Sequence, residues 1–171
     1  MKRLNFEYVL FRDSDSRISP REVVAIRQWI TSRKTLHIIR DHPYHRVPIP
    51  GGLWGLSEKV HSYSIAWNAA SHYGMDFGED QRFLARHVYR PLFFDKLVHN
   101  TFGVRSPCMP KLTPRLPDGE FIGERFDEHN LWVEHDRRVV KQSESQSLKN
   151  EIRKLKISGI ISFRAWLSTS W

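Results

Sequence analysis

Several features are scarce in this 171-residue sequence, and each scarcity excludes a class of protein. Cys108 is the only cysteine, so neither an internal disulfide nor a cysteine-based zinc site can form within one chain. No apolar run approaches the ~20 residues that a membrane-spanning helix needs. The N-terminal residues lack the small-residue cleavage site of a signal peptide. We therefore expect a cytoplasmic protein, and a hydrophobic content of 40% predicts a folded core.

The net charge of +8 is distributed unevenly along the chain. Residues 1–136 hold 19 basic and 17 acidic residues, whereas residues 137–156 hold seven basic and two acidic ones. We therefore predict a nearly neutral domain over 1–136 and a basic, partly flexible segment over 137–171. A nucleic-acid-binding domain is more uniformly basic, so no specific nucleic-acid partner is expected. Peripheral contact of the basic segment with an anionic membrane or polymer is the alternative to a solvated surface helix.

Hydrophobic periodicity predicts alternating strands and helices. The compact apolar run over 6–11 indicates a buried strand, and Ser19 is placed to cap a helix over 20–32. The other elements expected are a strand over 35–39, helices over 60–72 and 79–90, a strand tip over 97–99 and a proline-rich connector over 103–119. This order is typical of an α/β fold, with a small mixed sheet and flanking helices.

Asp13 and Asp15 form a D-x-D motif directly after the first predicted strand. Two carboxylates one residue apart can bind one divalent cation, and hard ions such as Mg²⁺ or Mn²⁺ prefer oxygen ligands. Loops at the carboxyl ends of strands are also where α/β proteins bind their ligands. A solvated turn held by aspartate hydrogen bonds is the structural alternative.

Two further motifs combine glycine with residues that can contact a ligand. In the sequence Gly-Gly-Leu-Trp-Gly over 51–55, the glycines allow close approach of a ligand, and Trp54 can stack on a sugar or a base. A tight turn with a core tryptophan explains the same pattern. Glu79 and Asp80 follow Gly78 at the start of a predicted helix, where a carboxylate acts either as a base or as an ordinary helix cap.

Histidines cluster in two other places. The sequence Arg-Asp-His-Pro-Tyr-His over 40–45 offers an imidazole and a carboxylate for acid–base chemistry or a transition metal, although Asp41 can equally cap a turn. Pro43 prevents a regular helical arrangement of these histidines, so the residues alone do not favour a zinc site there. His99 follows an apolar pair and is either a lone metal ligand or a polar strand end.

Taken in order, these motifs resemble the C-terminal catalytic half of GT-A-type nucleotide-sugar glycosyltransferases, particularly uncharacterised bacterial and viral members with a strand-borne D-x-D. The similarity spans residues 5–130. In such enzymes the D-x-D holds a divalent metal on the sugar-nucleotide diphosphate, and a later histidine often completes the metal site. The resemblance therefore implies metal binding (Mn²⁺ or Mg²⁺) by Asp13, Asp15 and His99, donor binding by Gly52, Trp54 and Arg12, and a catalytic base at Asp80 or Glu79.

The function that the resemblance implies is metal-dependent transfer of a sugar from a nucleotide sugar to a glycan or lipid-linked acceptor. GT-A domains usually place a nucleotide-binding half before the D-x-D. The resemblance thus also implies that the chain is inactive alone, with an exposed apolar edge beside residues 6–11 for the missing half or for a second copy. The donor, the acceptor and the stereochemical course stay open.

Two other classes of function are compatible with the residues. A metal-dependent hydrolase or nuclease would use Asp13, Asp15, Asp41 and His42, with the basic segment holding nucleic acid. A non-catalytic remnant that acts as a binding module is the third class.

Overall fold

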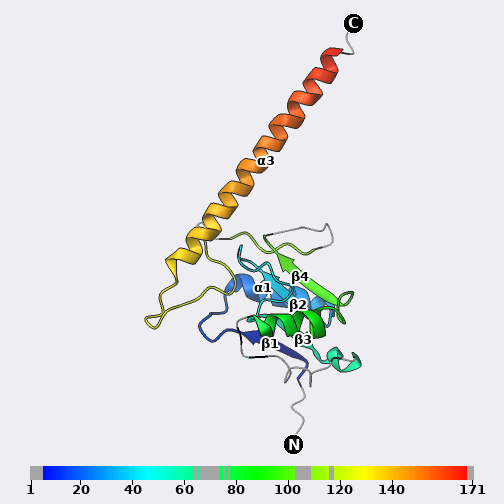
Figure 1. Cartoon of the computed structure of the whole chain (residues 1–171), viewed down its shortest axis with the longest axis vertical. Helices are drawn as coiled ribbons and strands as arrows, with labels where there is room; N and C mark the ends of the chain where they lie inside the picture. Colours follow the sequence, from blue (N-terminus) through cyan, green and yellow to red (C-terminus); the bar gives the residue numbers. More distant parts are fainter. Residues whose placement is uncertain are drawn as a thin grey trace, which may run out of the picture.

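The computed structural model describes residues 6–63, 65, 74, 76, 78–102, 109–115 and 118–168, with only the backbone of residue 152 and residues 154–168. Its body is an α/β arrangement around one mixed sheet (Figure 1). The elements, in chain order, are β1 (Tyr8–Arg12), α1 (Pro20–Ser32), β2 (Leu36–Arg40), β3 (Leu53–Ser57), the 3-10 helix η1 (Glu58–Ser62), α2 (Glu79–Phe83), the π-helix η3 (Leu84–Tyr89), β4 (Lys96–Asn100) and α3 (Glu134–Ser168).

The four strands lie in the order β1-β3-β2-β4. β3 is antiparallel to both of its neighbours, and β2 is parallel to β4. β1, β2 and β4 therefore run in the same direction, so their carboxyl ends meet at one edge of the sheet. The loop that enters β3 reaches this edge as well. Polar residues after three strands are thereby gathered from segments that are far apart in sequence.

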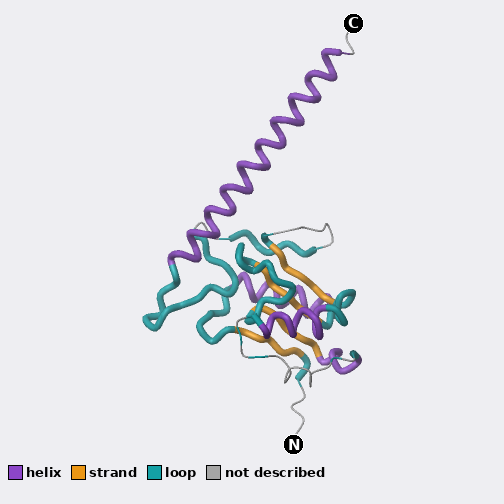
Figure 2. The backbone as a smooth tube through the Cα atoms, viewed as in Figure 1, coloured by secondary structure: helices purple, strands orange, loops and turns teal. Residues whose placement is uncertain are grey.

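Helices cover both faces of the sheet (Figures 1 and 2). On one face, buried side chains of β2, β3 and β4 pack against α2 and η3; this core comprises Leu36, Ile38, Ile49, Trp54, Leu56, Val60, Phe83, Leu84, Val88, Leu92 and Val98. On the other face, α1 packs with Ala25 and Trp29 against residues such as Ile39 and His37. Because side chains alternate along a strand, successive residues of each strand belong to different faces.

The expected helix over 20–32 is confirmed with its cap. The Ser19 hydroxyl accepts a hydrogen bond from the Glu22 amide at 3.2 Å, and Pro20 opens the helix. The helix ends at Arg33, which has φ 54°. Trp29 is fully buried because Gly55 of β3 leaves space for it: a Cβ there would lie 2.9 Å from the Trp29 ring.

The structure corrects two sequence predictions and confirms a third. Residues 6–11 are not a buried strand: in the described part of the chain β1 pairs only with β3, and its Leu10 and Phe11 are 38% and 37% exposed. The Gly-Gly-Leu-Trp-Gly segment is not only a turn, since it runs into the buried strand β3. The helix expected over 79–90 is confirmed: it runs from Glu79 to Tyr89, changes from an α-helix to a π-helix at Leu84, and ends before Pro91.

The remaining predictions have mixed outcomes. The strands expected over 35–39 and 97–99 correspond to β2 and β4. Of the helix expected over 60–72, residues 60–62 belong to η1, and most of the rest lies outside the described residues. The connector expected over 103–119 has no helix or strand in its described residues.

α3 extends away from the body as one continuous helix (Figure 2). Its first turns are anchored, because Asp136, Arg137 and Val140 are buried and Arg137 forms ion pairs with Glu124 and Asp118. The predicted boundary at residue 136 therefore falls inside the anchored start of the helix. Residues 144–151 of this helix are exposed to solvent. Within the described residues, no helix combines the length and the apolar character that crossing a bilayer requires.

Candidate functional site

The structure places Trp54 and Asp80 in the wall of one pocket at the carboxyl edge of the sheet, with Asp13 close by, next to Gly52. Asp13 directly follows β1, Trp54 lies on β3, and Asp80 is in the first turn of α2. A pocket of about 380 Å³ opens there; it is lined by Phe11, Gly51, Trp54, Gly74, Asp80, Phe83 and Leu84. Two carboxylates thus stand beside an otherwise apolar and aromatic pocket.

The two glycines before β3 let the acidic side chains approach the strand closely. A Cβ on Gly52 would lie 2.2 Å from the carboxylate carbon of Asp13 and 2.5 Å from its backbone nitrogen. A Cβ on Gly51 would lie 3.3 Å from an Asp80 carboxylate oxygen. The Gly51–Gly52 turn is therefore flanked by Asp13 and Asp80. The space beside Gly52 is filled by Asp13. Gly52 therefore makes room for Asp13 and not for a bound sugar donor.

The electrostatic environment of Asp13 disfavours its charge. Burial raises the pKa of the Asp13 carboxyl, and the neighbouring carboxylates Asp15 and Asp80 raise it further, against the opposing effect of Arg12. Asp15 is exposed, and its backbone carbonyl accepts a hydrogen bond from the Phe126 amide at 2.9 Å, which ties this loop to the body. The three carboxylates repel one another, and a cation bound between them would relieve that repulsion.

Trp54 forms a wall of the pocket. Its ring is stacked on Phe11 with centroids 3.9 Å apart and planes 7° apart, and its Nε1 donates to the Gly51 carbonyl at 3.0 Å. One face of the indole is therefore already covered. Phe11, which is partly exposed, presents an aromatic face beside Asp13. The sequence analysis missed Phe11, although it lies two residues before Asp13 and so projects to the same side of the strand.

Glu79 and Asp80 differ in their surroundings. Glu79 forms an ion pair with Arg82 at 2.7 Å one turn along α2, and its side chain is 18% exposed. Asp80 is exposed and lines the pocket. Of the two acids predicted at this helix start, Asp80 is the one that lines the pocket.

The structure does not bring Arg12 to this pocket. Arg12 lies on the α1 face of the sheet, where it forms an ion pair with the buried Glu22. Its Nη2 also donates to the Ser16 hydroxyl at 2.9 Å and to the Arg17 carbonyl at 3.1 Å. These contacts hold the loop that carries Asp13 against α1, so Arg12 positions the loop and does not face a donor in the pocket.

His99 also lies on the α1 face, away from Asp13. It is fully buried, with Nδ1 2.9 Å from His37 Nε2 and Nε2 2.7 Å from Gln28 Oε1. Burial lowers the pKa of His99 to about 4, and burial with repulsion from His99 lowers that of His37 to about 3. Both nitrogens of His99 are occupied, and the structure does not assemble it with Asp13 and Asp15.

No complete metal-binding set is gathered in the described part of the chain: no three acidic, histidine or cysteine side chains there are close enough to hold one ion. Asp13 together with Asp15 or Asp80 offers carboxylate oxygens from two residues. Mg²⁺ is commonly held by one or two carboxylates together with water and substrate phosphates, so this donor set fits a metal that arrives with a phosphorylated substrate.

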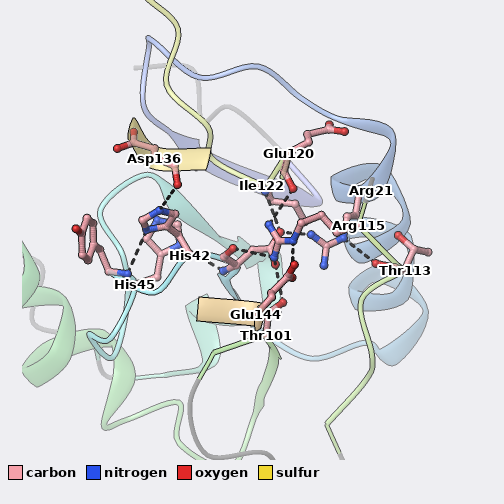
Figure 3. Close-up of polar contacts among 12 residues, drawn as sticks. Arg21, His42, His45, Thr101, Thr113, Arg115, Glu120, Ile122, Asp136 and Glu144 are labelled. Carbon is pink, nitrogen blue, oxygen red and sulfur yellow. Dashed lines mark hydrogen bonds and ion pairs between the residues drawn. The ribbon is translucent and has the colours of Figure 1, made fainter. Parts of the chain in front are cut away.

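Asp41 follows β2 at the same edge of the sheet, but its carboxylate is buried and fully engaged. It forms ion pairs with Arg21 and Arg115, and accepts hydrogen bonds from the Thr101 hydroxyl at 2.5 Å and the Ile122 amide at 3.0 Å. Figure 3 shows these partners converging from α1, from the end of β4 and from the segment before α3. Asp41 is therefore the centre of a cluster that fastens four segments together.

The histidines next to Asp41 are also part of the packing (Figure 3). His42 is buried; its Nε2 lies 3.2 Å from the Asp136 carbonyl, and its Nδ1 accepts from the Tyr44 amide at 3.1 Å. Burial lowers the pKa of His42, and it lowers the pKa of His45 to about 3, with His42 adding to the effect. These imidazoles are held neutral and turned toward the protein.

A second cavity, of about 510 Å³, lies beside this cluster; it is lined by Arg21, Asn100, Thr101, Met109, Pro110, Lys111, Leu112, Thr113, Pro114, Arg115 and Glu144. The guanidinium of Arg115 is engaged with Asp41, Glu144 and the Glu120 carbonyl, and Arg21 donates to the Thr113 carbonyl at 2.7 Å. The charged groups of this cavity are thus largely committed to one another. The pocket with Asp13 and Asp80 is the better candidate site.

No protein-family model, curated protein or solved structure matches this chain.

Proposed function

We propose that this chain carries the metal and acceptor side of a nucleotide-sugar glycosyltransferase, which transfers a sugar to a glycan or lipid-linked acceptor. The observation that carries the proposal is that Asp13 and Asp80 both approach the Gly51–Gly52 turn, with Asp80 and Gly51 lining one pocket. These acids come from motifs 67 residues apart in the sequence. The order of motifs that resembles GT-A enzymes, including the D-x-D, supports the same assignment.

Asp13 and Asp15 would hold the divalent cation, which supplies charge neutralisation for the diphosphate leaving group. The clustering of carboxylates that raises the pKa of Asp13 supports a cation at this position. His99 is not part of this proposal, because its ring nitrogens contact His37 and Gln28 on the other face of the sheet.

Asp80 is the residue that we assign to the acceptor hydroxyl. It is exposed at the pocket, whereas Glu79 is paired with Arg82. A carboxylate at this place can accept the hydroxyl proton as the new glycosidic bond forms. Phe11, which is partly exposed and stacked on the buried Trp54, is an aromatic side chain of the kind on which sugar rings pack.

Release of nucleoside diphosphate tests this function. We would incubate the full chain with Mn²⁺ and a panel of nucleotide sugars; any release that it catalyses should be lost in Asp13→Asn and Asp80→Asn. Glu128→Gln is the matched control, because the Glu128 side chain is 86% exposed and its contact is with the neighbouring His129. Calorimetry with Mn²⁺ and a nucleoside diphosphate gives a second readout; Asp13→Asn should weaken binding about tenfold, or ~1.4 kcal/mol. Absence of both turnover and binding would contradict the proposal.

A metal-dependent hydrolase or nuclease is less well supported by the geometry. Its residue set includes Asp41 and His42, which are buried and bound to Arg21, Arg115 and backbone groups. Cleavage of nucleic acid in the same assay, with no release from sugar nucleotides, would favour it.

A further inference from the structure

The turn between η3 and β4 carries two adjacent phenylalanines that project into solvent. Phe94 is 90% exposed and Phe93 is 49% exposed. The backbone of this turn is ordered by hydrogen bonds from the Phe93 amide to the Arg90 carbonyl and from the Asp95 amide to the Leu92 carbonyl. A folded turn that displays two aromatic side chains at its tip leaves apolar surface uncovered at a defined place.

Two lysines contact these phenylalanines, and a third lies next to one of the two. Lys34, between α1 and β2, donates to the Phe94 carbonyl at 3.1 Å. Lys96, on β4, donates to the Phe93 carbonyl and lies 3.4 Å from the centroid of the Phe93 ring. Lys59, on η1, donates to the Arg33 carbonyl at 3.0 Å, which places it next to Lys34 in the fold. We call Lys34, Lys59, Phe93, Phe94 and Lys96 the aromatic–lysine patch.

The acids near this patch neutralise only part of its charge. Asp95 lies 3.8 Å from Lys34, but its other oxygen is engaged by the hydroxyls of Thr35 and Tyr63. The pKa of Lys96 is lowered by burial and also by repulsion from Arg40 and Lys34, which indicates an excess of positive charge here. An anionic surface would relieve this repulsion.

We propose that the aromatic–lysine patch docks the protein on an anionic lipid surface, with Phe93 and Phe94 inserted between headgroups. The lysines would contact lipid phosphates around the inserted rings. The carbonyls of Phe93 and Phe94 already accept hydrogen bonds from Lys96 and Lys34, so the tip of the turn can leave water without losing partners for these groups. Phe94, the most exposed large apolar side chain in the described part of the chain, stands clear of the surface, which suits insertion into a bilayer better than contact with a groove.

The patch lies at the opposite edge of the sheet from Asp13. Residues 93–95 precede β4 and Lys34 precedes β2, whereas Asp13 follows β1, and these three strands run in the same direction. Docking through the patch therefore leaves Asp13 at the end of the strands that is distant from the lipid. The inference does not depend on the proposed function, since it uses none of the same residues.

Vesicle sedimentation tests the inference. We expect the full chain to bind vesicles of phosphatidylcholine and phosphatidylglycerol in equal parts, and to bind phosphatidylcholine alone at least tenfold more weakly. Phe93→Ser/Phe94→Ser and Lys34→Gln/Lys96→Gln should each reduce binding to the anionic vesicles about tenfold or more. Phe94→Leu, which keeps an apolar side chain, should retain most of the binding.

Matched controls distinguish this patch from other surfaces. Tyr44→Ser removes another exposed aromatic side chain, and Lys149→Gln/Arg153→Gln removes two charges from the exposed part of α3. Both controls should bind like the unaltered chain, and all variants should have unchanged melting temperatures within a few degrees. Equal binding to neutral and anionic vesicles, or loss of binding only in the α3 control, would overturn the inference. So would a change of oligomeric state in Phe93→Ser/Phe94→Ser with vesicle binding intact, which would assign the patch to a second copy.

Discussion

Asp13 and Asp41 occupy equivalent positions and have opposite surroundings. Each follows a strand of the same direction at the same edge of the sheet. Asp41 is 0% exposed and is met by two arginines, a hydroxyl and an amide, whereas Asp13 is met by two further carboxylates beside a pocket. Position in the fold therefore does not separate a structural aspartate from a candidate ligand, but the charges around it do.

The strongest test of this comparison is the stability of Asp41→Asn. The substitution leaves the guanidinium groups of Arg21 and Arg115 without their shared counter-charge in a site where both are largely buried. Breaking a buried ion pair from one side typically costs ~3–5 kcal/mol, and we expect a loss of that size in urea unfolding. A loss below ~1 kcal/mol would show that Asp41 is not the fastening point that its contacts indicate.

The pH dependence of stability extends the comparison to two buried histidines on the α1 face. His37 and His99 have pKa values of about 3 and about 4 in the folded protein, below the usual 6.5. The unfolded chain therefore binds more protons below pH 6.5, so stability is complete above that pH and falls as the pH decreases toward 4. When unfolding takes up one to two protons, the free energy of unfolding changes by roughly 1.4–2.7 kcal/mol per pH unit.

Urea unfolding at a series of pH values measures this slope. His99→Gln should reduce it, because one buried imidazole fewer takes up a proton on unfolding. His129→Gln is the control, since the His129 side chain is 75% exposed. An equal slope in all three proteins would mean that other groups dominate the acid sensitivity.

Glycine substitutions probe how closely the Asp13 loop approaches the sheet. In Gly52→Ala the new methyl group would lie 2.2 Å from the Asp13 carboxylate and 2.5 Å from its backbone, so the loop must move. We expect a loss of ~1–3 kcal/mol, typical of overpacking, together with loss of Mn²⁺ binding. Gly78→Ala is the control; it has φ 85° but nothing within 4 Å of a new Cβ, so it should cost only ~1 kcal/mol and leave Mn²⁺ binding intact.

Local signals predicted the α/β class, α1 and the placement of acids at strand ends, because capping and periodicity are local. The sequence analysis failed where distant segments decide the outcome. Nothing near Asp41 in the sequence reveals that Arg115, 74 residues later, neutralises it. Likewise, His99 lies on a strand as predicted, but its side chain is on the α1 face, where it contacts His37 of the neighbouring strand. The buried strand β3 was missed since its glycines indicate a turn when read without their packing partners.

The smallest expected effect is that of Asp13→Asn on stability. Burial, Asp15 and Asp80 raise the pKa of Asp13, so the folded state disfavours its charge, and Asn should leave stability unchanged or raise it by up to ~1 kcal/mol at neutral pH. A raised folded pKa gives stability that is present at low pH and lost as the pH rises, so the variant and the unaltered chain should converge below the ordinary aspartate pKa. Saturating Mn²⁺ should reverse the order at neutral pH, because the cation stabilises only the carboxylate form. Urea midpoints with and without Mn²⁺ measure both effects, and a variant that is less stable without metal would place Asp13 with Asp41 among the structural carboxylates.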